Sequence, residues 1–143
     1  MTRVRDPIHD YIDLTSLETK LVDTPAYQRL RWIRQLGPAN LVYPGANHTR
    51  HEHCMGTCHV VGRMADSAGL DSEERQLASA AGLLHDLGHS PFSHLGDEID
   101  GLENHVDRTT SLISETEISD ILSNEGIDTN EINQIITGKH KLG

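Results

Sequence analysis

The segment from Asp71 to Asp86 constrains the fold of this chain more than any other. Asp71 is followed three residues later by Glu74, the capping-box pattern that satisfies the free amides of a helix N-terminus. Apolar residues then recur at the spacing of one helix face, namely Leu77, Ala80, Ala81 and Leu84. Small side chains between them allow a second helix to approach closely. We therefore predict a central, buried helix that ends at His85-Asp86.

The pair His85-Asp86 places an imidazole and a carboxylate at the end of that helix. Successive helical side chains diverge by about 100°, so both can reach one ion only where the last turn loosens, which we expect Gly88 to cause. Ten histidines occur in the chain, and seven of them lie between His48 and His94, a density that favours metal binding or acid-base chemistry. The alternative is a hydrogen-bonded core histidine followed by a loop aspartate.

A third metal ligand has to come from another element. The sequence predicts a helix over residues 50–69, and antiparallel packing would bring its start beside the end of the helix that carries His85. His53, close to that start, is the donor we select. Two imidazoles and a carboxylate, without cysteine, suit a first-row divalent ion with open water positions, such as Mn, Fe, Co, Ni or Zn.

The remaining segments predict an all-α bundle with a short N-terminal β-hairpin. Residues 3–14 alternate around a proline-containing turn, the pattern of a hairpin. Thr24 precedes a proline and begins an amphipathic pattern that runs to about residue 36, with Leu30, Ile33 and Leu36 facing inward. Shorter helices are expected over 104–114, 117–124 and 130–137.

Length and charge limit the possible functions. A chain of 143 residues and 15.8 kDa fits one domain, residues 1–143. Its net charge of -10 repels a nucleic-acid backbone, and its five aromatic residues offer little for base stacking. Positive charge is nevertheless concentrated over residues 24–51, which hold four arginines and no acid, whereas residues 97–143 hold eleven acids and three bases. The basic stretch favours binding of a small phosphorylated molecule.

The cysteines and the hydropathy pattern indicate a cytoplasmic protein. Cys54 and Cys58 lie four residues apart on one predicted helix, a poor geometry for a disulfide. No apolar run approaches the roughly 18 residues of a membrane span, and the N-terminus lacks the pattern of a signal peptide. We therefore expect no membrane association.

Several short strings resemble one enzyme family along nearly the whole chain. They are Asp6-Pro7-Ile8-His9, Asp23-Thr24-Pro25, Gln28-Arg29-Leu30-Arg31, Gln35-Leu36-Gly37, Pro44-Gly45-Ala46, Arg50 with Glu52-His53, His85-Asp86-Leu87-Gly88-His89 and Pro91-Phe92-Ser93-His94. In order and spacing the chain resembles the HD-superfamily deoxynucleoside triphosphate triphosphohydrolases, most closely the branch of the vertebrate nucleotide-regulated enzyme. This resemblance implies a helical HD domain that hydrolyses deoxynucleoside triphosphates to deoxynucleoside and triphosphate, with dGTP the first substrate to test.

The resemblance also implies a set of metal ligands. In this family two histidines and two aspartates hold a divalent ion, and His53, His85 and Asp86 match three of them. The fourth lies in an Asp-x-x-Asp-Tyr-like stretch that would follow residues 138–143. The chain therefore resembles the N-terminal portion of such an enzyme, an HD phosphohydrolase domain truncated on its C-terminal side. We add Mg to the divalent ions that these ligands are expected to hold.

The resemblance assigns further roles to three groups of residues. It places His94, His105 and Asp97 in the catalytic group. It places Gln35 at the sugar of the substrate, and Arg50 and His89 at the phosphate chain, where an arginine suits phosphate oxygens. It matches Asp23, Gln28 and Arg31 to positions that read the guanine of an effector nucleotide at a subunit interface, so a guanine-nucleotide effector is a further expectation.

The sequence leaves two alternative functions open, and it also predicts an assembly state. The same ion could serve a phosphodiesterase or nucleotidase acting on another phosphoester. A catalytically silent HD fragment could instead bind nucleotide or metal, or act in assembly. An HD fold without its C-terminal part should leave apolar surface uncovered, so we also expect a homo-oligomer.

Overall fold

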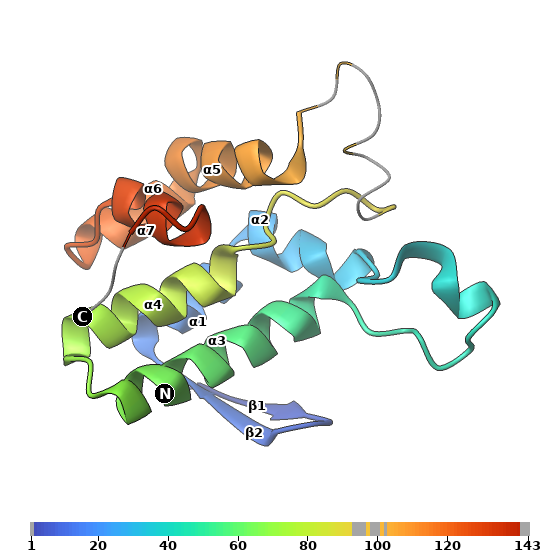
Figure 1. The fold of residues 1–143 in the computed structure, drawn as a ribbon, viewed down its shortest axis with the longest axis horizontal. Helices are drawn as coiled ribbons and strands as arrows, with labels where there is room; N and C mark the ends of the chain where they lie inside the picture. Colours follow the sequence, from blue (N-terminus) through green and yellow to red (C-terminus); the bar gives the residue numbers. More distant parts are fainter. Residues whose placement is uncertain (1, 93–96, 98–100, 102, 141–143) are drawn as a thin grey trace.

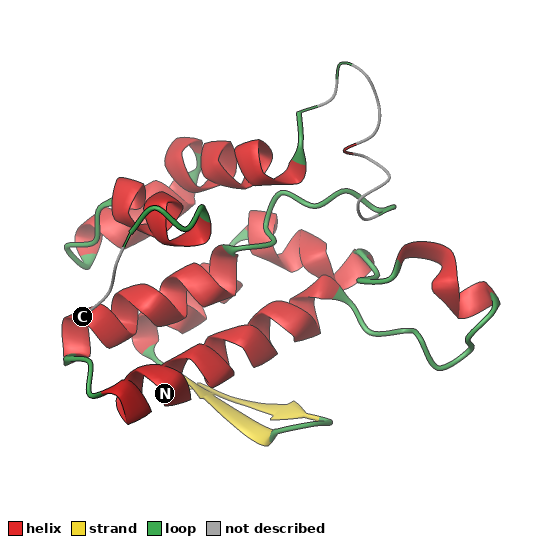
Figure 2. Ribbon diagram, in the orientation of Figure 1, coloured by secondary structure: helices red, strands yellow, loops and turns green. Residues whose placement is uncertain are grey.

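The computed structural model describes residues 2–92, 97, 101 and 103–140. Within them the chain is mostly helical with one small antiparallel sheet, as Figures 1 and 2 show, and the predicted fold class is confirmed. In chain order the elements are β1 (Thr2–Asp6), β2 (Asp10–Leu14), α1 (Ser16–Val22), α2 (Pro25–Gln28), the 3-10 helices η1 (Arg29–Trp32) and η2 (Gly37–Leu41), α3 (Arg50–Ala68), α4 (Ser72–Leu84), α5 (His105–Glu115), α6 (Glu117–Asn124) and α7 (Thr129–Ile136).

Helices α3 and α4 form an antiparallel pair at the centre of the fold (Figure 1). Thr49 caps the start of α3, and its backbone amide donates to the Glu52 side chain at 2.7 Å. Gly69 caps the end of α3 and takes the left-handed φ of 76°. A Cβ at Gly82 of α4 would lie 3.2 Å from Cγ2 of Val61, so the small residue permits the close approach that the sequence predicts.

The other elements cover the two sides of this pair. Helices α5, α6 and α7 lie on the side of α4, and the β1–β2 hairpin lies on the side of α3 (Figure 1). Strands β1 and β2 pair antiparallel, from Thr2 with Leu14 to Asp6 with Asp10. The core between the layers includes fully buried side chains of several elements, among them Leu21, Leu83, Leu84, Ile113, Ile118 and Ile132. This core fixes the α3–α4 pair.

The predicted helix over 25–36 is wrong beyond Trp32. The backbone of Ile33 is extended, and Arg34 forms an isolated antiparallel β-bridge with Thr49, just before α3. Ile33 accepts a hydrogen bond from the Arg50 amide at 2.8 Å, and the Gln35 amide donates to the His48 carbonyl at 3.1 Å. These long-range bonds use the Ile33 carbonyl and the Gln35 amide, and they replace the bonds that these two groups would make in a continued helix.

This change also alters which apolar residues are buried. Leu30 and Ile33 lie in the core as predicted, whereas Leu36 is 53% exposed rather than inward-facing. It belongs to a group of exposed apolar side chains, which we call the exposed apolar group: Trp32, Leu36, Leu41, Val42, Tyr43 and Phe92. Its residues lie on η1, on η2 and the residues that flank η2, and in the segment after α4.

The remaining helices agree well with expectation. α6 has the predicted ends, and α5 and α7 lie within one or two residues of theirs. Cys54 and Cys58 are free and buried. The sequence interpretation missed α1, although Thr15 and Glu18 form its capping box. In the described ranges, none of the helices has the length and apolar character that a membrane span needs.

Candidate metal centre

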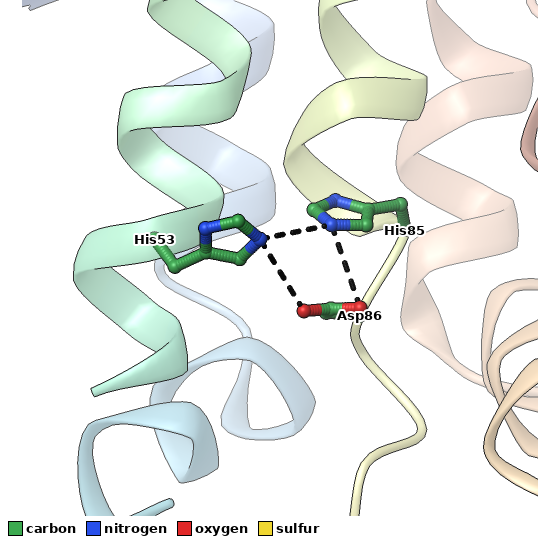
Figure 3. A group of neighbouring side chains, drawn as sticks. All are labelled: His53, His85 and Asp86. Carbon is green, nitrogen blue, oxygen red and sulfur yellow. Dashed lines mark hydrogen bonds and ion pairs between the residues drawn. The ribbon is translucent and has the colours of Figure 1, made fainter. Parts of the chain in front are cut away.

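His53, His85 and Asp86 converge at one end of the α3–α4 pair. His53 lies in the first turn of α3, and His85 directly follows the last residue of α4. The Nε2 atoms of the two histidines are 3.2 Å apart. They lie 3.5 Å and 3.4 Å from the carboxylate oxygens of Asp86, as Figure 3 shows. Antiparallel packing thus brings the three predicted ligands together.

The separations and the donor types fit one divalent ion. Candidate ligand atoms of the three side chains all lie within 4.8 Å of one another. Atoms that bind a tetrahedral ion from about 2.1 Å lie about 3.4 Å from one another, close to the observed separations. Two imidazoles and a carboxylate suit a first-row divalent ion. The cluster could therefore hold such an ion.

A hydrogen bond to the main chain orients the His85 ring. Its Nδ1 lies 2.8 Å from the carbonyl oxygen of Gly82. A carbonyl only accepts hydrogen bonds, so Nδ1 carries the proton and Nε2 presents a lone pair toward His53 and Asp86. Histidine ligands of metals have this arrangement in most proteins. The hydrogen-bonded core histidine considered from the sequence is thus compatible with a metal ligand.

Asp86 lies among cationic and hydrogen-bonding side chains. Arg50 is 3% exposed and contacts Oδ2 of Asp86 through Nη1. The Nε2 atom of His89, a residue 1% exposed, lies 3.3 Å from Oδ1. Burial acts to raise the pKa of the Asp86 carboxyl, but the His89 hydrogen bond and the charges of His85 and Arg50 outweigh burial and lower that pKa. Asp86 is therefore ionised at neutral pH, the form that binds a cation.

Burial favours the neutral form of two histidines near Asp86, His53 and His89. Burial lowers the pKa of His53, against the opposing effect of Asp86. Burial likewise lowers the pKa of His89, against its hydrogen bond to Asp86. A neutral imidazole can bind a metal without first losing a proton. His53 is therefore suited to act as a ligand near pH 7.

Two further predicted residues adjoin His89. The rings of His89 and His105 are stacked, with centroids 4.0 Å apart and planes 16° apart. Asp97 accepts hydrogen bonds from the backbone amide of His105 at 2.9 Å and from its Nδ1 at 2.6 Å. A continuous series of side-chain contacts thus runs from Asp86 through His89 and His105 to Asp97. The third residue of the predicted catalytic group, His94, lies outside the described residues.

A cavity opens beside the metal-ligand cluster. It measures about 670 Å³ and is lined by His53, Gln35 and His48, by the turn of the β1–β2 hairpin and by one face of α3. Gln35 reaches the cavity because its backbone pairs with His48. The residue that the resemblance places at the sugar therefore lies on the same cavity as His53.

The three residues matched to an effector site lie on a short stretch of the fold. Asp23 is exposed and ends α1. Gln28 ends α2, and its side chain donates to the Val22 carbonyl at 2.8 Å and accepts from Nε of Arg31 at 2.7 Å. Gln28 and Arg31 are thus held together, and Asp23 lies one turn earlier in the chain.

Gly88 acts differently from the sequence expectation. α4 ends at Leu84, so Gly88 does not end it. A Cβ at Gly88 would lie 2.3 Å from the His105 carbonyl oxygen, so glycine is required for close contact with α5. The Gly88 amide also donates to the hydroxyl of buried Thr109 at 2.8 Å. The sequence interpretation missed Thr109, since only the fold brings it to this turn.

Comparisons with known proteins agree with this site. The HD domain family matches residues 50–143. The deoxynucleoside triphosphate triphosphohydrolase SAMHD1 of Homo sapiens is 43% identical over 104 residues, which cover 68% of this chain and 17% of that protein. The uncharacterised protein YwfO of Bacillus subtilis is 41% identical over 125 residues, which cover 82% of this chain and 29% of that protein.

A solved structure extends the similarity to the whole fold. A hypothetical protein from Aquifex aeolicus has a TM-score of 0.83 and 37% sequence identity, covering 98% of this chain and 38% of that chain. The chain thus spans less than a third of the length of the two curated relatives. Because the family match covers more than half of its residues, this chain belongs to the HD domain family, and over its HD region it is similar to deoxynucleoside triphosphate triphosphohydrolases.

Proposed function

We propose that this chain carries the metal centre of a phosphohydrolase that converts deoxynucleoside triphosphates to deoxynucleoside and triphosphate, with dGTP the first substrate to test. The observation that carries the proposal is the convergence of His53, His85 and Asp86 within 4.8 Å. The name of the human relative supports the substrate class. We assign this activity to one HD phosphohydrolase domain, residues 1–143.

The residues present suit an ion that acts on a phosphoester. Bound here, a divalent ion of Mn, Fe, Co, Ni, Zn or Mg would polarise a phosphoryl oxygen and increase the acidity of water. Arg50 contacts the Asp86 carboxylate, and its guanidinium is of the kind that suits a phosphate chain. Gln35 lies on the cavity beside His53, where it can bind the sugar.

The His105–Asp97 pair suits proton transfer to the departing oxygen. The Asp97 carboxylate accepts from Nδ1 of His105 at 2.6 Å, so Nδ1 carries the proton and Nε2 is the nitrogen that exchanges one. His89 stacks on this ring and lies against Asp86. We propose His94 as the third member of this group, on the resemblance of the sequence.

The test is release of inorganic triphosphate from dGTP by the purified chain with Mn²⁺. We expect turnover by the wild type and none by His85→Ala. His59→Ala is the matched control, because His59 lies on α3 but contacts the His9 ring rather than the metal-ligand cluster. Equal rates in the wild type and His85→Ala would contradict the proposal.

The products also separate the alternative functions. Release of phosphate or of a monophosphate would indicate a phosphodiesterase or nucleotidase. Binding of dGTP and Mn²⁺ by calorimetry without turnover would indicate a silent binding or assembly module. Running both measurements on one preparation distinguishes these outcomes.

We also propose a guanine-nucleotide effector and self-association. Gln28 and Arg31 are bonded to each other beside exposed Asp23, which supports a shared contact with one base. The exposed apolar group, in which Trp32 is 86% exposed, supports an interface between copies of the chain. Light scattering with and without GTP tests both proposals. We expect an oligomer in solution. We also expect GTP to raise its mass or to make it more stable toward dissociation.

A further inference from the structure

The turn that follows Asp86 is held from both sides by arginines. Arg29 of η1 donates from Nη2 to the Leu87 carbonyl at 2.6 Å and from Nη1 to the His89 carbonyl at 2.8 Å. Arg108 of α5 donates from Nη1 to the Gly88 carbonyl at 3.2 Å. All three carbonyls of residues 87–89 are therefore bonded to guanidinium groups.

Arg29 makes these bonds from a distant part of the chain. It precedes the turn by almost sixty residues, and its guanidinium is half-buried. Burial and the charge of Arg108 lower the pKa of Arg29. In the described part of the chain Arg29 forms no ion pair that would offset burial. The interactions that this placement allows are the two hydrogen bonds from Arg29 to the carbonyls of Leu87 and His89.

The turn joins two groups of the metal centre. Asp86 immediately precedes it, and His89 ends it, with Nε2 of His89 3.3 Å from Oδ1 of Asp86. Fixing the carbonyls at both ends of the turn fixes the direction of the Asp86 carboxylate relative to His53 and His85. Partners of this kind orient metal ligands without touching the ion.

We infer that Arg29 is a positioning residue of the metal centre, because its guanidinium fixes the Leu87–His89 turn and thereby aims the Asp86 carboxylate. This inference rests on the proposed metal-dependent function. It connects η1, which follows the predicted effector residue Gln28 and contains Arg31, to the turn beside the metal ligand Asp86.

Positioning and simple electrostatics predict opposite effects of removing Arg29. A positive charge near Asp86 repels a cation, so its loss alone would tighten metal binding. Loss of the two carbonyl bonds instead frees the turn and weakens binding. The sign of the change therefore distinguishes the two causes.

The test compares Arg29→Gln and Arg29→Lys with Arg34→Gln, a control for charge on an exposed arginine of the adjacent segment. Mn²⁺ affinity is measured by calorimetry on the complete chain, and circular dichroism reports the fold. We expect Arg29→Gln to bind Mn²⁺ about 10- to 100-fold more weakly, the usual effect of losing a partner of a metal ligand. Arg29→Lys keeps the charge but not the paired donors, so it should also bind more weakly. Arg34→Gln should match the wild type.

Hydrogen exchange supplies a second readout that needs no metal. The His89 amide donates to the Asp86 carbonyl at 3.2 Å, and the Gly88 amide donates to Thr109. Both amides should exchange faster in Arg29→Lys than in the wild type. Unchanged or tighter Mn²⁺ binding in folded Arg29 variants would overturn the inference. If the wild type binds no Mn²⁺, the proposed function fails, and unchanged exchange at Gly88 and His89 would separately overturn the role of Arg29.

Discussion

Gly88 and His105 are packed so closely that no side chain fits between them. A Cβ at Gly88 would lie 2.3 Å from the His105 carbonyl oxygen and 2.5 Å from the backbone nitrogen of Thr109. These neighbours are backbone atoms of α5, which cannot move as the end of a side chain can. The contact joins the turn after Asp86 to the helix that carries His105.

Gly88→Ala should therefore displace α5 from the turn. We expect a loss of about 1–3 kcal/mol in the free energy of unfolding, the usual cost of overpacking. Urea denaturation followed by circular dichroism measures it. Gly45→Ala is the control, because a Cβ at Gly45 meets no atom within 4 Å and should change stability little. Equal midpoints for the two variants would contradict this packing.

Thr109→Val should destabilise the same contact by a different route. The Thr109 hydroxyl accepts from the Gly88 amide at 2.8 Å and donates to the His105 carbonyl at 2.7 Å. Valine keeps the shape but leaves the buried amide without its acceptor, at a cost of about 1–3 kcal/mol. Thr109→Ser keeps the hydroxyl and should retain most of the stability in the same urea experiment. A stable Thr109→Val would show that the bond contributes little.

Acid should destabilise the chain through His51. This buried side chain contacts the Tyr27 ring, and no group among the described residues bonds to its Nε2. Burial, with the charge of Arg31, lowers the pKa of His51 to about 4. Its pKa in the unfolded chain is about 6.5, so between these values the unfolded chain binds a proton that the native chain does not. The contribution of His51 to the free energy of unfolding should thus be constant above pH 6.5. It should fall as the pH drops from 6.5 toward 4.

The difference between the wild type and His51→Phe isolates this effect. Phenylalanine keeps an aromatic ring against Tyr27 but does not titrate. We expect the melting temperature of the wild type to fall relative to that of His51→Phe between pH 6.5 and pH 4, and to keep a constant difference above pH 6.5. A difference that does not change between pH 7.5 and pH 4 would show that His51 does not titrate in this way.

Local patterns were sufficient to predict the centre of the fold. The start of α4 follows from the capping box of Asp71 and Glu74, and α3 ends at Gly69 because glycine takes the left-handed conformation easily. Once both helices run antiparallel, His53 lies beside His85. The predicted ligands therefore depended only on local signals and one packing assumption.

Long-range contacts account for what the sequence could not show. The helix predicted over 25–36 ends early because Ile33 and Gln35 pair with residues near the start of α3. Gly88 serves contact with α5, and Arg29 reaches a turn almost sixty residues away. None of these partners lies close in sequence. α1 differs, since the capping box of Thr15 and Glu18 is a local signal in the sequence that indicates its start.

Diffraction from crystals of the chain soaked with Mn²⁺ would test the central claim most directly, because the anomalous signal locates the ion. We expect one strong peak within bonding distance of Nε2 of His53, Nε2 of His85 and a carboxylate oxygen of Asp86, and no peak there in His85→Ala. A Mn²⁺ peak elsewhere, with none among these three side chains at saturating metal, would contradict the assignment of the metal centre.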